Sequence, residues 1–142
     1  MTERHVTDWL SLTTEEFPPD AIAVLPVAAV EQHGPHLPVG VDTYIAQAYL
    51  ARARALLPRS SNVVLLPVQA VGASDEHRAF RGTLTLSPET ALRAFIEIGE
   101  SVHRAGISVR KRISASEDDL TPDQIVERIV RWPNRWPRRL SR

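Results

Sequence analysis

Four side chains that could bind a metal ion lie close together between residues 31 and 42. They are Glu31, His33, His36 and Asp42, and they follow directly on an apolar run at residues 22–30. Carboxylate oxygens and imidazole nitrogens suit Zn²⁺ or Mn²⁺, and a carboxylate has two oxygens with which to bridge two ions. The pattern indicates a metal site; the alternative is a solvated turn in which the two carboxylates cap backbone amides.

The apolar run at residues 22–30 determines where these side chains lie. It has no alternation of polar residues, which is typical of a strand covered on both faces in a parallel sheet. If the strand continues far enough, Glu31 and His33 point to the same side of it, and Asp42 returns after a loop. The ligands then lie at a strand end, where open α/β sheets place their sites. His36, a lone loop histidine, is expected to be a surface residue or to support a ligand.

The neighbouring segments predict a βαβ unit. Residues 43–57 have helical spacing, with Asp42 or Thr43 as N-cap, and residues 63–66 form a second apolar strand. Pro26 inside the first strand indicates an edge position, a bulge or a break, because proline has no N–H to donate.

Further along the chain, residues 69–86 read as a loop or hairpin that could fold over the site. Ser87 and Pro88 then start a helix that runs to about residue 105, and Gly106 stops it. A third strand is expected at residues 107–113. Before the first strand, Thr13 and Glu16 have capping-box spacing, which predicts a short helical turn.

Size and composition exclude several classes of protein. A chain of 142 residues with 43% hydrophobic content suffices for one domain with a core. There is no cysteine, so any metal must be held by His, Asp or Glu. No stretch approaches the roughly 20 apolar residues of a membrane span, and no signal-peptide pattern begins the chain, so we expect a cytoplasmic protein with no membrane partner.

Two segments together resemble one family. The first, VAAVEQHGPHLPVGVDT, is similar to the creatininase signature, an apolar strand followed by Glu-Gln-His-Gly and a later Val-Asp. The second, ASDEHRAFRGTLTLSPET, is similar to a family segment with Glu-His, Phe-Pro-Gly-Thr and a Leu-Ser helix start. The resemblance covers roughly residues 10–109. It implies a three-layer α/β/α fold with a mainly parallel sheet, and commonly a homo-hexamer.

The resemblance also implies a chemistry. Family members are metal-dependent amidohydrolases with two divalent ions, Zn²⁺ or Mn²⁺, which hydrolyse a C–N amide bond in a small or cyclic substrate by metal-bound hydroxide. Carried over by residue, Glu31 would ligate one ion, His33 the other, and Asp42 would bridge them. Glu76 and His77 would lie near the substrate, and no side chain is assigned a catalytic role.

The C-terminal part departs from the family. The remaining family ligands would follow residue 109 in a turn that resembles Asn-Gly-His, but here the chain reads RKRISASEDDL, with no histidine after His103. We therefore expect residues 1–112 to form the N-terminal part of a creatininase-like domain. Residues 113–142 would be a divergent, truncated or frame-shifted tail, with a short helix at 121–132 and then disorder.

This departure leaves three functions open. The first is a metal-dependent amidohydrolase. The second is an inactive remnant that associates with a full-length homologue. The third is a nucleic-acid binder that uses the C-terminal arginines with Trp132 and Trp136. The formal net charge of zero and the lack of a recognised module count against the third.

Overall fold

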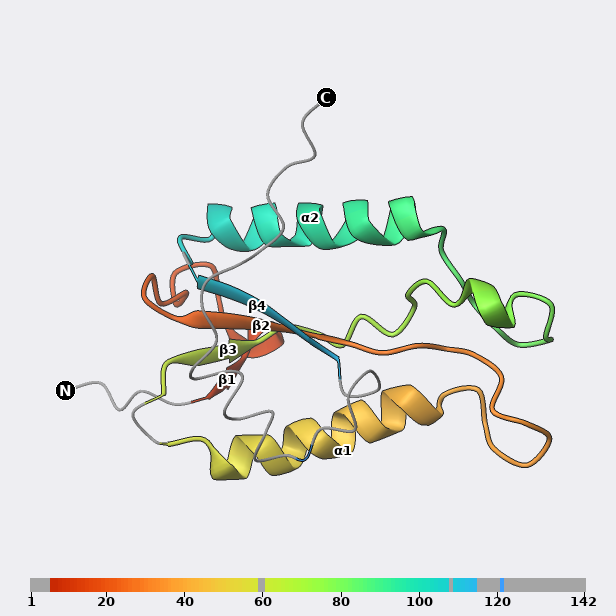
Figure 1. The fold of residues 1–142 in the computed structure, drawn as a ribbon. Coiled ribbons are helices and arrows are strands. Elements are labelled where there is room, and N and C mark those ends of the chain that lie inside the picture. The colour runs from red at the N-terminus through yellow and green to blue at the C-terminus, as the bar shows by residue number, and fades with distance from the viewer. Residues whose placement is uncertain (1–5, 59–60, 108, 115–120, 122–142) are drawn as a thin grey trace.

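The computed structural model describes residues 6–58, 61–107, 109–114 and 121 of the chain. Figure 1 shows a sheet between two helices, α1 on one face and α2 on the other, which confirms the α/β/α fold. In chain order the elements are β1 (Thr7–Asp8), the 3-10 turn η1 (Trp9–Ser11), β2 (Ile22–Val27), α1 (Val41–Leu56), β3 (Val63–Leu65), the 3-10 turn η2 (Asp75–His77), α2 (Pro88–Arg104) and β4 (Val109–Ser114).

The described sheet has the strand order β1-β3-β2-β4, and every pair of neighbouring strands is parallel. The units β2–α1–β3 and β3–α2–β4 cross the sheet in opposite directions, so their helices cover opposite faces. The predicted βαβ unit is confirmed. β1, which the sequence did not predict, has only two residues and extends the sheet beside β3.

The core lies on both faces of β2, as its continuous apolar sequence predicts. Val24 packs toward α1 in one cluster, and Ala23 and Leu25 pack toward α2 in the other. Because successive side chains of a strand point to opposite faces, a strand between two helix layers needs apolar residues at every position. The largest fully buried side chains include Val24, Val63, Val64 and Ile107.

Pro26 marks a break in the pairing of β2 with β3, while the pairing of β2 with β4 continues through Pro26. β2 is an interior strand, so the edge position is excluded; β2 pairs with β3 only up to Val24, opposite Leu65. Contact with the following segment resumes where Gln69 donates its N–H to the Pro26 carbonyl (2.9 Å). The missing N–H of Pro26 lies in this gap, where no strand requires a donor.

The two helices begin differently. Ser87 caps α2 as predicted, since its Oγ accepts from the Thr90 N–H (3.2 Å), and Gly106 follows the helix with φ of 88°. For α1 the predicted cap is wrong: Gly40 is the N-cap, and Asp42 lies in the first turn. The Asp42 side chain contacts His33, and Thr43 Oγ1 donates to the Ala29 carbonyl, so neither hydroxyl nor carboxylate caps the helix.

Two other expectations concern the ends of the chain. Thr13 donates its N–H to Glu16 Oε2 (2.8 Å), as in a capping box, but the segment is a turn and not a helix. The predicted helix at residues 121–132 and most of the tail at 113–142 lie outside the described residues. Among the residues that are described, neither helix has the length and apolar character needed to cross a membrane.

Candidate metal centre

Glu31 and His33 lie on a loop beyond the carboxyl end of β2, and Asp42 lies in the first turn of α1. The strand ends at Val27, so it is shorter than the apolar run at residues 22–30 that predicted it and does not reach Glu31. Instead, Val30 forms an isolated antiparallel bridge with Leu84, and the Glu31 N–H donates to the Val39 carbonyl (3.1 Å). Contacts with two other loop segments therefore hold the ligand segment in place.

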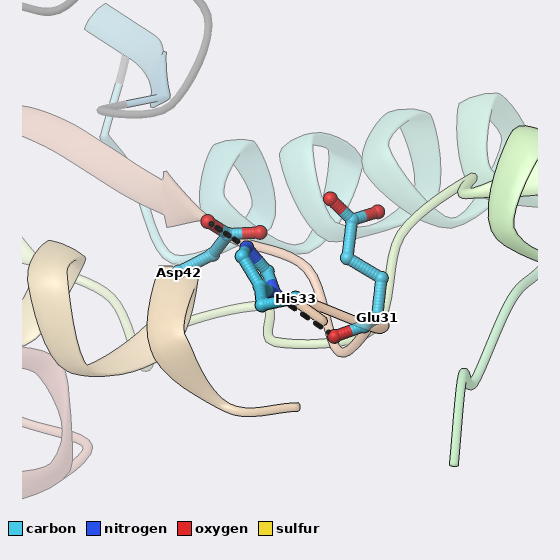
Figure 2. A group of neighbouring side chains, drawn as sticks. All are labelled: Glu31, His33 and Asp42. Atoms are coloured by element: carbon cyan, nitrogen blue, oxygen red, sulfur yellow. Dashed lines mark hydrogen bonds and ion pairs between the residues drawn. The ribbon is translucent and has the colours of Figure 1, made fainter. Parts of the chain in front are cut away.

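The structure brings Glu31, His33 and Asp42 together, as predicted. Each offers one ligand atom, and these atoms all lie within 4.8 Å of one another. His33 Nε2 is 3.3 Å from Asp42 Oδ1, and Figure 2 shows the imidazole between the Asp42 carboxylate and the Glu31 backbone. Asp42 belongs to the first turn of α1, where the helix N-terminus favours negative charge.

The hydrogen bond on the other side of His33 fixes which nitrogen can bind a metal. Nδ1 lies 2.9 Å from the Glu31 carbonyl oxygen, which can only accept, so Nδ1 carries a proton. In the neutral ring the lone pair is then on Nε2, which faces Asp42. A metal-bound histidine almost always donates its other N–H to such a partner.

The pKa of His33 is raised from its ordinary value. The main cause is the hydrogen bond to the Glu31 carbonyl; desolvation opposes it, and the Asp42 carboxylate adds to it. A proton at Nε2 and a divalent ion at Nε2 satisfy the same negative surroundings, so they compete for this position.

The donor set fits a borderline or hard divalent ion. Two carboxylates and one neutral imidazole suit Zn²⁺ and Mn²⁺, and their two negative charges balance one divalent ion. The side chains of Glu31, His33 and Asp42 are 17%, 22% and 12% exposed, so the cluster is partly shielded yet open to a small ligand.

Glu76 and His77 lie beside the same cluster. His77 belongs to η2, and its Nε2 is 3.8 Å from Glu31 Oε1. Glu31, Glu76 and His77 form a second group of metal-capable atoms within 4.8 Å of one another. The structure thus brings the residues expected near the substrate to the side of the site where Glu31 lies.

His36 lies apart from this arrangement. Its side chain is exposed, and among the described residues no hydrogen bond or ion pair connects it with Glu31, His33 or Asp42. A supporting role for His36 stays a prediction.

Sequence reasoning missed Gln32. Its Oε1 accepts from the Gly34 N–H (2.9 Å) and its Nε2 lies 3.0 Å from Nδ1 of His77. Its place between two candidate ligands was the available signal. Gly34 has φ of 78°, a conformation that favours glycine, so this turn depends on the residue after His33.

The fold has a parallel sheet between two helix layers, and a carboxylate–imidazole cluster lies beyond the carboxyl end of an interior strand. These two features define the class as an α/β protein with a candidate metal site. The family model Creatininase, described as creatinine amidohydrolase, matches residues 8–110. This chain belongs to the creatininase family.

Individual proteins that this chain resembles belong to the same family or are described as creatininases. The mycofactocin precursor peptide peptidase of Mycobacterium tuberculosis (strain CDC 1551 / Oshkosh) is 35% identical over 98 residues, which are 64% of this chain and 39% of the relative. A solved structure described as "Creatininase Mn" has a TM-score of 0.63 and 23% identity over 77% of this chain and 45% of its own. A solved structure of a creatininase mutant described as "Zn-Zn type" has a TM-score of 0.64 and 22% identity over 88% of this chain and 52% of its own.

The chain therefore spans 39% of the length of that peptidase and 45% of the manganese structure. At this level of identity the solved structures show the fold alone.

Proposed function

We propose that this chain carries the metal-binding part of a metal-dependent amidohydrolase that cleaves a C–N amide bond in a small or cyclic substrate. The observation that carries the proposal is the convergence of Glu31, His33 and Asp42 at the carboxyl end of β2. The family supports the reaction class, and relatives described as Mn and Zn-Zn forms support the choice of metals.

Asp42 is the residue best suited to bridge two ions. Its Oδ1 contacts His33 Nε2, its ligand atom lies within 4.8 Å of that of Glu31, and its carboxylate has two oxygens. Glu31 would hold one ion, His33 would hold the other, and Asp42 would contribute to both. Divalent ions held there would supply Lewis acidity to a water molecule and to the amide carbonyl.

In this proposal Glu76 and His77 bind and orient the substrate. Glu76 is exposed at the margin of the site, and His77, 27% exposed, faces the Glu31 carboxylate. In this proposal Glu76 accepts, and His77 donates, a hydrogen bond to a compact amide. Such contacts position the reacting bond against the ions, which is a large part of catalysis.

Metal binding and hydrolysis are tested together. Zn²⁺ or Mn²⁺ is added to the metal-free chain, and hydrolysis of a panel of compact and cyclic amides is measured. We expect stoichiometric binding and hydrolysis, both lost in Glu31→Gln. Glu97→Gln, the same change at an exposed position of α2, is the control. A folded chain that binds neither metal would contradict the proposal.

The small donor set favours a second candidate function. Among the described residues, the ligands assigned to two ions that share Asp42 are Glu31 and His33, whereas zinc takes about four ligands. In this alternative the chain is inactive and associates with a full-length homologue. Co-purification with such a homologue, without hydrolysis by the metal-loaded chain alone, would favour it. Size-exclusion chromatography with light scattering distinguishes a complex with the homologue from the homo-oligomer that the family resemblance implies.

A further inference from the structure

Gln32 lies on the loop that carries Glu31 and His33, and it connects this loop to the segment that carries η2. Its backbone N–H donates to Thr83 Oγ1 (3.2 Å), and its side-chain Oε1 accepts from the Gly34 N–H (2.9 Å). Its Nε2 lies 3.0 Å from Nδ1 of His77. None of these contacts is made to the side chains of Glu31, His33 or Asp42.

The orientation of the Gln32 amide follows from chemistry. A backbone N–H can only donate, so the side-chain atom next to Gly34 is the carbonyl oxygen, and the amide nitrogen faces His77. An –NH₂ group can only donate, so Nδ1 of His77 must accept. The proton of the neutral His77 ring is therefore on Nε2, the nitrogen 3.8 Å from Glu31 Oε1.

In His33 the proton and the lone pair are on the opposite ring nitrogens from those in His77. Its Nδ1 faces the Glu31 carbonyl, which accepts, so its Nε2 has the free lone pair. Residues 31–34 therefore set two neighbouring histidines in opposite tautomers. If Nε2 of His77 bound an ion, the ring proton would move to Nδ1 and face the donor of Gln32. The geometry of Glu31, Glu76 and His77 alone would allow a cation, but this hydrogen bond opposes it.

We propose that Gln32 is a positioning residue that holds His77 as the Nε2–H tautomer. His77 then donates a hydrogen bond into the site, to the Glu31 carboxylate or to a substrate oxygen beside it, and is not a metal ligand. The direction of the donor rests on the proposed function, because Glu31 is assigned there as a ligand. The tautomer itself does not depend on that assignment.

The test is long-range ¹H–¹⁵N NMR of the ¹⁵N-labelled chain at about pH 8, where unperturbed histidines are neutral. The His77 signals are identified by their loss in His77→Asn. In the metal-free wild type we expect Nε2 in the protonated range and Nδ1 in the unprotonated range. In Gln32→Glu, whose carboxylate can only accept, Nδ1 should move to the protonated range. Gln32→Met removes the donor without adding charge and should give a mixture of tautomers.

The matched control is Gln47→Glu, the same substitution at an exposed position of α1, which should leave His77 unchanged. The proposal is overturned if His77 carries its proton on Nδ1 in the wild type, or if neither Gln32 variant changes its tautomer. Zn²⁺ is then added to the wild type. The signal of His33 Nε2 should shift and His77 should keep its Nε2 proton; metal-bound Nε2 of His77 overturns the proposal. If Zn²⁺ shifts neither ring, the metal assignment fails, and the metal-free spectra still decide the role of Gln32.

Discussion

Nε2 of His33 lies 3.3 Å from Oδ1 of Asp42, which joins the loop after β2 to the first turn of α1. The contact depends on the Nδ1 hydrogen bond to the Glu31 carbonyl, because that bond turns Nε2 toward the carboxylate. One backbone carbonyl thus orients the imidazole, and the helix start supplies the carboxylate opposite it.

Replacing Asp42 should weaken metal binding more than it affects folding. Asp42→Asn removes one of three protein ligands and one negative charge. We expect Zn²⁺ affinity to fall at least tenfold, since even partners outside the ligand shell typically contribute about 10- to 100-fold. Calorimetric titration of the metal-free chain measures this, with Glu97→Gln as control. An unchanged dissociation constant would remove Asp42 from the site.

The placement of this contact shows what the sequence could predict. Apolar segments and the Ser87 cap predicted β2, β3 and both helices, since burial and capping depend on local residue types. The N-cap of α1 was not predictable, because Asp42 and Thr43 bond to His33 and Ala29 on the preceding loop. The end of β2 was not predictable, because Val30 pairs with Leu84, which is distant in sequence. The role of Gln32 was missed for the same reason, since its partner His77 is distant in sequence.

The metal-free chain should lose part of its stability as pH rises. The folded-state pKa of His33 is raised, so protonated His33 stabilises the fold. This contribution is complete below the unfolded pKa, about 6.5, and is lost as pH rises through the higher folded value. Urea unfolding with a chelator, from below that window to above it, should show a gap between wild type and His33→Gln that shrinks with pH. A gap that widens would contradict the sign.

Ile107 should be among the most costly core positions. Its side chain is fully buried in the cluster under α2. Ile107→Ala should lower the free energy of unfolding by about 2–5 kcal/mol, and Ile107→Val by about 1 kcal/mol. Leu10→Ala is the control, because Leu10 is 79% exposed. Equal losses at both positions in urea unfolding would count against the packing of this layer.

Two glycines with similar backbone angles should respond differently to alanine. Gly106, with φ of 88°, has nothing within 4 Å of an added Cβ, so Gly106→Ala should cost about 1–2 kcal/mol of backbone strain. Gly82, with φ of 90°, would place a Cβ 3.1 Å from Val39 Cγ1. Gly82→Ala should therefore cost more and should also weaken Zn²⁺ binding, because the Val39 carbonyl holds the Glu31 N–H. Thermal unfolding and metal titration of both variants test this; equal stability losses with unchanged Zn²⁺ affinity would contradict it.

The most direct test of the metal assignment is a crystal structure of the zinc-loaded chain with diffraction recorded at the zinc absorption edge. We expect an anomalous peak bonded to Nε2 of His33, at about 2.0–2.1 Å, and to a carboxylate oxygen of Asp42 or Glu31. Nδ1 of His33 should still donate to the Glu31 carbonyl. A peak held by other residues, with Glu31, His33 and Asp42 free of metal, would contradict the assignment.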